Sequence, residues 1–564
     1  MDATVLPLTW PSDFDLSDLR RFETEARKLR YQALGKACSQ KGITALMVAH
    51  HADDQAETVL MRLSSHRVRS GLQAMQSVEW IPECTGMYGV YHSGADRRLG
   101  SSSNHRLPEQ GGIQVLRPLL SFPKARLVAT CEERKIPWAE DQTNQDPTLT
   151  ARNAVRHIYK HHKLPEALSV ESLVNLSLCM QRRVEAHKAY AERLFDQCLL
   201  QLTTQTGYLL VRFPPFAALL DRPIASYSDR DQARNNAYHL IKRVADLVSP
   251  RSIAPLGKLA AAVDKIYPEF VAIKSAAGLS AARKNFCVYG VWWRVCDKPS
   301  PFVGRCEVGV DAILPHPREW HLHRQPFDDR ERTPAAHVTE YPPLSGFTSA
   351  SKHSYVFFDG RFWVNVRNLS FSTLVLRRFS HDDNSRLNSS PSNRFITAAL
   401  RLLKPWDLRF VLPAVFCKDE ATGEETLVGF PTLDVRIEDG QSPLGNPVCK
   451  WSVRYKKVEF GRHRPDAILA AGISKQEIDD EEERHWRVGQ RSSKSKGERK
   501  KKACEVEAMG MRQAEEQKDG TNMDPVLGSE KPTLPPMKPP VADAESMTPD
   551  VETADWYDLF GNGR

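Results

Sequence analysis

The stretch VAHHADDQAETVLMRL, residues 48–63, decides the fold because it joins an apolar run to an amphipathic helix. The run ITALMVA, residues 43–49, has the β-rich composition of a buried strand. At helical spacing His50, Asp54 and Glu57 fall on one face, and apolar side chains fill the opposite face. A strand that leads directly into such a helix is typical of an α/β protein.

The polar side chains of this stretch lie where an open α/β sheet binds ligands, beyond the C-terminal ends of its strands. The helix macrodipole favours Asp53 and Asp54 in a first turn, but it does not explain two adjacent His residues. Carboxylates so placed can hold Mg²⁺ on a phosphate chain or orient an ammonium group. A metal-dependent phosphohydrolase that uses His50, His51 and Asp54 stays an alternative at this point.

The composition indicates several folded units. The chain has 564 residues and a net charge of +8, whereas one domain usually holds about 100–200 residues. A single small binding module is therefore excluded. No apolar run reaches the roughly 18 residues of a membrane span, so no membrane partner is expected. The 11 Cys residues form no CxxC pair, which argues against a Cys-based metal site.

Five segments are predicted along the chain: an α/β unit (1–165), a mostly helical region (166–310), a linker (311–354), a β-rich unit (355–465) and a disordered basic and Pro-rich tail (478–564). Within the first segment, residues 79–112 are rich in Gly, Ser and charge and are predicted to be an inserted surface loop. The β-rich unit begins with a hairpin signal, the dipeptide Asp359-Gly360. In the tail, nine Lys or Arg against one Glu between residues 484 and 502 give a local net charge of +8.

Several His-containing or polar stretches have a structural explanation. His187 lies on the apolar stripe of a predicted helix and is expected to pack there, partly buried. His316, His321 and His323 suggest a metal site, but the flanking Pro residues favour a solvated loop. The string SHDDNSRLNSSPSN, residues 380–393, is expected to be a polar linker.

Four short motifs follow one another over residues 23–156: EARKLRYQAL, AHHADDQAETVLMRL, LRPLL and WAEDQTNQDPTLTARNAVR. They resemble, in the same order, the AR..RY helix, HHxDDxxET, RPLL and D.(S/T)N....RN.(I/V)R patterns of the tRNA(Ile)-lysidine synthetase family of PP-loop ATP pyrophosphatases. The resemblance implies a Rossmann-like PP-loop ATPase domain over residues 1–165. It also implies that the helical region contacts tRNA and that the β-rich unit corresponds to a C-terminal tRNA-binding domain.

The activity implied by the resemblance is an ATP-dependent ligation that forms lysidine. The wobble cytidine of a tRNA(Ile) with a CAU anticodon is adenylated at C2, pyrophosphate leaves, and the ε-amine of L-lysine then displaces AMP. The implied cofactors are ATP and Mg²⁺, the implied partners are tRNA(Ile), L-lysine and ATP, and a homodimer is a possible assembly. A catalytically inactive tRNA-binding homologue is the alternative from within the same family.

The resemblance also assigns roles to residues. Asp54 and Glu57 would bind and position the lysine ammonium, with Arg30 as their ion-pair partner. His50 and Asp53 would lie towards the nucleotide, and Asp53 is the candidate Mg²⁺ ligand. The nucleotide-binding set is His51, Arg117 and Arg152, and the tRNA-binding set is Arg126, Asn153 and Arg156.

A second polar cluster precedes and begins the predicted helix ARNAVRHIY. Asp141 and Asn144 suggest a capped turn, and Arg152 and Arg156 stand at i and i+4 on one face of that helix. Such an Arg pair can bridge the phosphates of ATP or tRNA. The alternative is ordinary solvated charge on a helix surface.

One signature of the family, the loop SGGxDS that follows its first strand and cradles pyrophosphate with backbone N–H groups, is missing from the sequence. The string HSGADR at residues 92–97 follows HHADD instead of preceding it and is not that loop. Either the sequence begins after the first βαβ unit, or it is a degenerate homologue. We favour the first, because both carboxylates, the His pair and the RN..R element are retained together. An incomplete N-terminus would be compatible with mitochondrial localisation, and a complete one with the cytoplasm.

Overall fold

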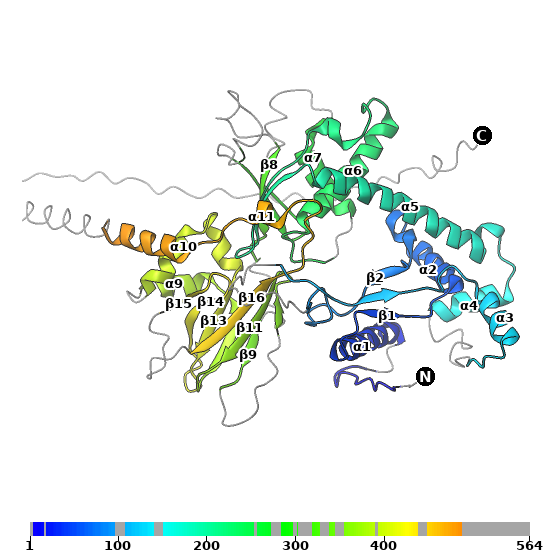
Figure 1. Cartoon of the computed structure of the whole chain (residues 1–564), viewed down its shortest axis with the longest axis horizontal. Helices are drawn as coiled ribbons and strands as arrows, with labels where there is room; N and C mark the ends of the chain where they lie inside the picture. Colours follow the sequence, from blue (N-terminus) through cyan, green and yellow to red (C-terminus); the bar gives the residue numbers. More distant parts are fainter. Residues whose placement is uncertain are drawn as a thin grey trace, which may run out of the picture. The chain divides into compact units, whose positions relative to one another are not determined.

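A computed structural model describes twelve parts of the chain (Figure 1): residues 4–15, 19–95, 108–139, 151–252, 256–271, 284–296, 302, 318–327, 338–343, 355–389, 393–437 and 448–487. The architecture is mixed α/β, with a small sheet near the N-terminus and three further sheets after it. Within these ranges no helix combines the length and the apolar character that crossing a membrane requires.

The N-terminal sheet has the strand order β1-β3-β2. Strand β1 (Ala45–Met47) pairs in parallel with β3 (Gln114–Leu116), and β3 pairs antiparallel with β2 (Val78–Trp80). Helix α1 (Leu19–Gln40) contributes Tyr31 and Cys38 to an apolar core with Val115 of β3. Because β1 and β3 are parallel, their C-terminal ends lie at the same edge of the sheet. That edge carries the first part of the candidate site.

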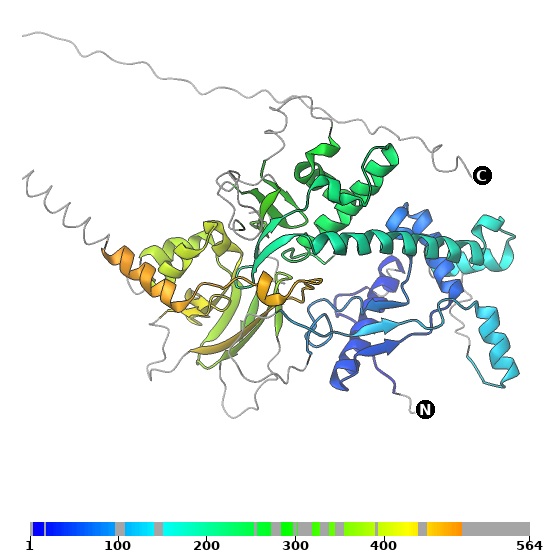
Figure 2. The same cartoon turned by 45° about the horizontal axis from the view of Figure 1, so that its top comes forward.

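Helix α2 (Ala52–Ser64) follows β1 and buries its apolar face in a different core, against α5 (Val170–Phe195). Figures 1 and 2 show α5 as a long helix that extends from α2 to α6 (Tyr227–Ala245), and it packs against both. The shorter helices α3 (Lys124–Glu133) and α4 (Ala151–His161) lie between β3 and α5 in the chain, and α4 packs on α2.

A buried polar network fixes the short helix η1 (Arg69–Gln73) between α2 and α5. Gln55 Nε2 donates to Ser177 Oγ at 2.8 Å, and Ser177 Oγ donates to the Gln73 carbonyl oxygen at 2.8 Å. Gln181 Nε2 donates to the same carbonyl oxygen at 2.7 Å. Since these polar groups satisfy one another, their hydrogen bonds offset the cost of desolvation, and the network holds α2 against α5.

The segment 79–112 differs from the predicted surface loop. Ile81, Cys84 and Val90 are buried in the core beneath α1, and the Glu109 amide donates to the Tyr455 carbonyl oxygen at 2.8 Å. Its apolar side chains are spaced too irregularly for a periodic signal, and Gly86, Gly89 and Gly94, all at positive φ, build tight turns instead of a solvated loop. Residues 96–107 lie outside the described residues.

The second sheet is antiparallel, with the order β4-β5-β8-β7-β6. Its strands are β4 (Leu199–Thr203), β5 (Tyr208–Arg212), β6 (Phe286–Val288), β7 (Val291–Val295) and β8 (Glu319–Arg324). Together with α6 and α7 (Ala260–Ile266), they make the region predicted to be mostly helical a mixture of helices and strands. Strand β8 is the central strand of this sheet, although its residues fall in the predicted linker 311–354.

The solvated-loop interpretation is wrong for two of the three His residues near β8. His323 is buried in the strand and only 1 % exposed, and His321 is half-buried there. Their neighbours Trp320 and Leu322 are buried on the opposite face, so both faces of this central strand are covered. His316 lies outside the described residues.

The two C-terminal sheets have the orders β15-β14-β13-β12-β9 and β10-β11-β16. Their strands are β9 (Thr339–Tyr341), β10 (Val356–Phe358), β11 (Phe362–Asn368), β12 (Thr373–Arg378), β13 (Pro413–Lys418), β14 (Glu425–Phe430), β15 (Val435–Arg436) and β16 (Cys449–Tyr455). The predicted hairpin joins β10 to β11, with Asp359 at φ 47° and Gly360 at φ 62°. A Cβ at position 360 would stand 2.0 Å from the Pro250 carbonyl oxygen, so this turn requires Gly.

The polar stretch 380–393, expected to be a linker, contains helix α9 (His381–Ser389). Ser380 and Asp383 cap it reciprocally: the Asp383 amide donates to Ser380 Oγ at 3.2 Å, and the Ser380 amide donates to Asp383 Oδ2 at 2.8 Å. Helix α10 (Arg394–Leu402) follows and buries Ile396 and Leu400.

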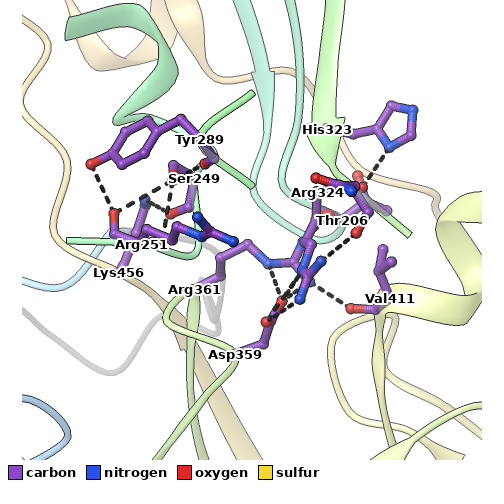
Figure 3. Close-up of polar contacts among 11 residues, drawn as sticks. Thr206, Ser249, Arg251, Tyr289, His323, Arg324, Asp359, Arg361, Val411 and Lys456 are labelled. Atoms are coloured by element: carbon purple, nitrogen blue, oxygen red, sulfur yellow. Dashed lines mark hydrogen bonds and ion pairs between the residues drawn. The ribbon is translucent and has the colours of Figure 1, made fainter. Parts of the chain in front are cut away.

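One continuous apolar core extends from Ala191 to Ile478, so the predicted helical region and β-rich unit share a core. Helix α11 (Pro465–Ile468) closes it, since the Ala470 amide donates to the Leu202 carbonyl oxygen of β4 at 2.9 Å. Figure 3 shows a charged cluster, Arg324, Asp359 and Arg361, inside this region. The predicted tail lies outside the described residues from residue 488 onward.

Candidate functional site

The C-terminal edge of the parallel strands brings His50, after β1, next to Arg117, after β3. The buried Arg117 donates through Nε to His50 Nδ1 at 3.4 Å and through Nη1 to Glu79 Oε2 of β2 at 2.8 Å. Burial lowers the pKa of His50; the Asp54 charge opposes this shift and Arg117 adds to it. His50 is therefore neutral near pH 7 and can accept a hydrogen bond.

His51 and Asp53 fix the starts of two helices. His51 precedes α2, and its amide donates to Asp54 Oδ2 at 3.0 Å, which satisfies one of the open N–H groups of the first turn. Asp53 Oδ2 accepts from the Lys124 amide of α3 at 2.7 Å and lies 3.5 Å from His51 Nδ1. The contact with the Asp53 carboxylate raises the pKa of His51, and the same contact lowers the pKa of Asp53. Asp53 thus anchors α3 to α2.

Two carboxylates of α2 meet two guanidinium groups of α4 at the centre of the site. Asp54 and Glu57 are 8 % and 4 % exposed. Arg156 Nε donates to Glu57 Oε1 at 2.7 Å, and Arg156 Nη2 lies 3.3 Å from Asp54 Oδ1. Arg152 Nε stands 3.6 Å from Glu57 Oε2. Burial raises the pKa of Glu57, against the opposing effect of Arg156.

The Glu57 carboxylate is incompletely hydrogen-bonded. Within the described residues its buried Oε2 accepts no hydrogen bond, and the facing Nε of Arg152 donates none. A buried charged oxygen without a donor costs free energy, roughly 1–3 kcal/mol or more. The Glu57 carboxylate therefore keeps one open acceptor, a buried oxygen that an N–H group of a ligand would satisfy.

Arg30, predicted to pair with these carboxylates, lies exposed on α1, and the pairing guanidinium groups come from α4 instead. The reason is packing, because α1 buries its apolar face in the core with Val115, whereas α2 packs in the separate core with Leu173. The Arg30 guanidinium carbon stands 5.9 Å from the centroid of the Tyr31 ring.

Other predicted residues are placed in different ways. Asn153 is buried on α4, whereas Arg126 is exposed on α3, with its guanidinium 5.2 Å from the Phe122 ring centroid. Asp141 and Asn144 lie outside the described residues. His187 is partly buried, as predicted, with Nδ1 2.7 Å from Asn236 Oδ1.

The described residues contain no group of three or more His, Cys, Asp or Glu side chains arranged to hold a metal ion. His50 and His51 are engaged with Arg117 and Asp53, so the geometry does not favour a transition-metal site built on the His pair. Sequence reasoning missed Glu79, which orients Arg117, and no pattern around that position signals its role.

The segment that contains this site is similar to a known protein family. Residues 8–162 match the model of the PP-loop domain family. This segment is a PP-loop domain. The domain contains all the carboxylate, His and Arg residues of the site described above, and it implies the use of ATP.

The chain is similar to proteins named tRNA(Ile)-lysidine synthase. It is 27 % identical over 434 residues to a probable tRNA(Ile)-lysidine synthase of Schizosaccharomyces pombe, covering 76 % of this chain and 77 % of that protein. It is 32 % identical over 176 residues to the Methylobacterium nodulans protein and 34 % identical over 178 residues to the Rhodopseudomonas palustris protein. These two matches cover 43 % and 42 % of the bacterial proteins, less than half of their length. The match to the S. pombe relative is much longer than the PP-loop domain and so extends beyond it.

Proposed function

We propose that this protein is an ATP-dependent ligase that joins L-lysine to C2 of the wobble cytidine of tRNA(Ile) with a CAU anticodon, forming lysidine. The PP-loop domain and the names of the homologues support this activity. The observation that carries it is the open acceptor on the buried Glu57 carboxylate, beside Asp54. An ammonium group offers three N–H donors and a positive charge, which complements two neighbouring carboxylates.

The proposed reaction has two steps. The wobble cytidine is first adenylated at C2 by ATP, and pyrophosphate leaves. The ε-amine of lysine then attacks C2, a C–N bond forms and AMP leaves. The amine must lose a proton to become a nucleophile, and the raised pKa of Glu57 makes its carboxylate a better proton acceptor. Asp54 would orient the same amine, because positioning the two reactants lowers the barrier of their bond formation.

The residues proposed to contact the nucleotide are more exposed than Asp54 and Glu57. We propose that Arg152, whose guanidinium is partly exposed, and His51 contact the phosphates of ATP, and that buried Arg117 acts by holding His50 neutral. The Asp53 side chain is 36 % exposed and would hold Mg²⁺, which commonly binds one or two carboxylates together with substrate phosphates. Bound Mg²⁺ would neutralise charge on the pyrophosphate.

The two Arg residues considered as tRNA contacts in the PP-loop domain differ in exposure and in their partners. Arg126 is exposed and available to a phosphate, whereas Arg156 is committed to the two carboxylates. We therefore propose Arg126 as a tRNA contact and Arg156 as a positioning residue for Glu57.

The test measures incorporation of labelled lysine into a tRNA(Ile) transcript with a CAU anticodon, using the full-length product of the gene. Incorporation should require ATP and should fall at least 100-fold in Glu57→Gln, which keeps the shape of the side chain and removes its charge. The matched control is Glu83→Gln, because Glu83 forms an exposed pair with Arg27. A folded wild type that binds this tRNA but adds no lysine would support an inactive tRNA-binding homologue.

A further inference from the structure

A cavity of about 220 Å³ lies outside the site described above. Its walls come from the segment after β2, from the turn that follows α6, and from β10, β11 and the residues after β16. The first wall includes Tyr91 and His92, in the stretch predicted to be an inserted loop. The cavity therefore requires three parts of the chain that are distant in sequence.

Most of the charged residues that line the cavity are basic. Arg251, Lys456 and Lys457 all contribute to its surface, and Arg251 is exposed. Among its lining residues Asp246 is the one carboxylate, and Lys242 Nζ already neutralises it at 2.6 Å. An anion that enters the cavity thus meets a net positive charge.

Lys456 is the most deeply desolvated of these three basic residues. Figure 3 shows it beside Ser249 and Arg251, and its Nζ donates to the Ser249 carbonyl oxygen at 2.5 Å. Burial lowers the pKa of Lys456 to about 7, mainly because its ammonium is desolvated without a dedicated carboxylate. A bound anion would supply the missing counter-charge and restore the protonated form.

Another part of the cavity wall is aromatic. Phe357 and Trp363 stack with their ring centroids 4.3 Å apart, and the Tyr91 ring lies 5.9 Å from Phe357. His92 lies beside Trp80 at 5.0 Å, and its buried Nδ1 makes no hydrogen bond within the described residues. Aromatic rings next to cations match a nucleotide, whose base stacks while its phosphate pairs with Lys and Arg.

Strand β2 connects this cavity to the PP-loop site. Glu79 holds Arg117 on one side of the strand, and the next residue, Trp80, lies 3.7 Å beneath the Nζ of Lys457. Successive side chains of a strand point to opposite faces. The two sites therefore lie on opposite sides of one short strand.

We propose that this cavity binds a nucleotide phosphate, with Arg251, Lys456 and Lys457 as its cationic partners and the aromatic wall beside the base. The phosphate belongs either to the RNA substrate or to a free nucleotide. The RNA source rests on the proposed function, whereas binding of a free nucleotide does not.

The experiment compares Arg251→Gln and Lys457→Gln with the control Arg464→Gln, all in the full-length protein. Arg464 is 83 % exposed in a surface pair with Asp466, so its substitution removes the same charge away from the cavity. Dissociation constants for the tRNA(Ile) transcript are measured from 50 to 200 mM KCl, and those for AMP by calorimetry. The thermal transition of each variant establishes that it is folded.

For the RNA source, each cavity variant should weaken tRNA binding three- to tenfold at 100 mM KCl. It should also reduce the slope of log K against log salt by about 0.7–0.9, one phosphate contact. For the free-nucleotide source, AMP binding is lost in both cavity variants while tRNA binding matches the control. The proposal is overturned if the cavity variants match Arg464→Gln for both ligands. Because the lysine incorporation assay is separate, failure of the proposed ligase activity is distinguished from failure of this cavity.

Discussion

Replacing Asp359 with Asn should destabilise the C-terminal core by about 3–5 kcal/mol. Asp359 stands in the β10–β11 turn between two buried guanidinium groups. Arg361 Nη2 lies 2.9 Å and Arg361 Nε 3.0 Å from Asp359 Oδ2, and Arg324 Nε lies 3.2 Å from the same oxygen. The substitution keeps the size of the side chain and one acceptor oxygen, so its main effect is to remove the negative charge.

The magnitude follows from what the two Arg residues lose. Arg361 is fully buried, and burial lowers its pKa, which measures the cost of its charge in this position. Its remaining hydrogen bonds are to carbonyl oxygens, Thr206 at 3.3 Å and Val411 at 2.5 Å. These dipoles do not replace a carboxylate, and removal of one partner from a buried ion pair typically costs 3–5 kcal/mol.

Urea unfolding followed by tryptophan fluorescence measures this effect, because Trp293 and Trp320 are buried in the same core. With a denaturant slope of about 3 kcal/mol/M, the midpoint should fall by about 1 M or more. The control is Asp466→Asn, whose exposed pair with Arg464 should contribute less than about 1 kcal/mol. A midpoint for Asp359→Asn that matches this control would refute the assignment of the cluster as a required charge pair.

Three further predictions concern the PP-loop domain and the hairpin. Arg156→Gln should destabilise the domain by about 1–3 kcal/mol in thermal unfolding, because it leaves the buried Glu57 carboxylate poorly paired; an unchanged Tm would contradict this. The raised pKa of His51 contributes stability that is present below its unfolded pKa of about 6.5 and lost as pH rises through the folded value. Accordingly, the Tm advantage of wild type over Asp53→Asn should shrink between pH 6 and pH 8.5, and a constant difference would exclude this linkage. Gly360→Ala should destabilise the core by more than about 1 kcal/mol in urea, because a Cβ would meet a carbonyl oxygen at 2.0 Å and φ is 62°; a neutral result would show that the turn can shift.

The sequence predicts the parts of the site that are local in the chain. His50, Asp54 and Glu57 fall within two helical turns after a strand, so their common placement follows from helix geometry alone. The sequence does not predict which Arg pairs with Asp54 and Glu57. Arg30 and Arg156 belong to different helices, and each lies near an apolar stripe. Only the packing of α1 and α2 in separate cores decides between them.

Tertiary packing, which a local sequence pattern does not reveal, also explains why strand β8 differs from its prediction. In EWHLHR, Trp320 and Leu322 alternate with His321 and His323, a pattern of one buried and one solvated face. The structure makes β8 a central strand between β5 and β7, and both faces are covered. Helix α9 is a different case. Its capping pair, Ser380 and Asp383, is visible in the sequence, but the polar composition of the segment favours a linker over a helix.

Strand β2 shows why the two polar sites of this protein depend on each other. It has three residues and, among the strands that the structure describes, pairs with β3 alone, with Glu79 opposite Val115 and Trp80 opposite Gln114. A shift of one residue in this register would exchange the faces of Glu79 and Trp80. Arg117 would then lose its carboxylate partner, and Lys457 would lose the ring beneath it. The contacts on either side of β2 therefore fix its register together, so a substitution at Trp80 that shifts the strand should also disturb the His50–Arg117 pair.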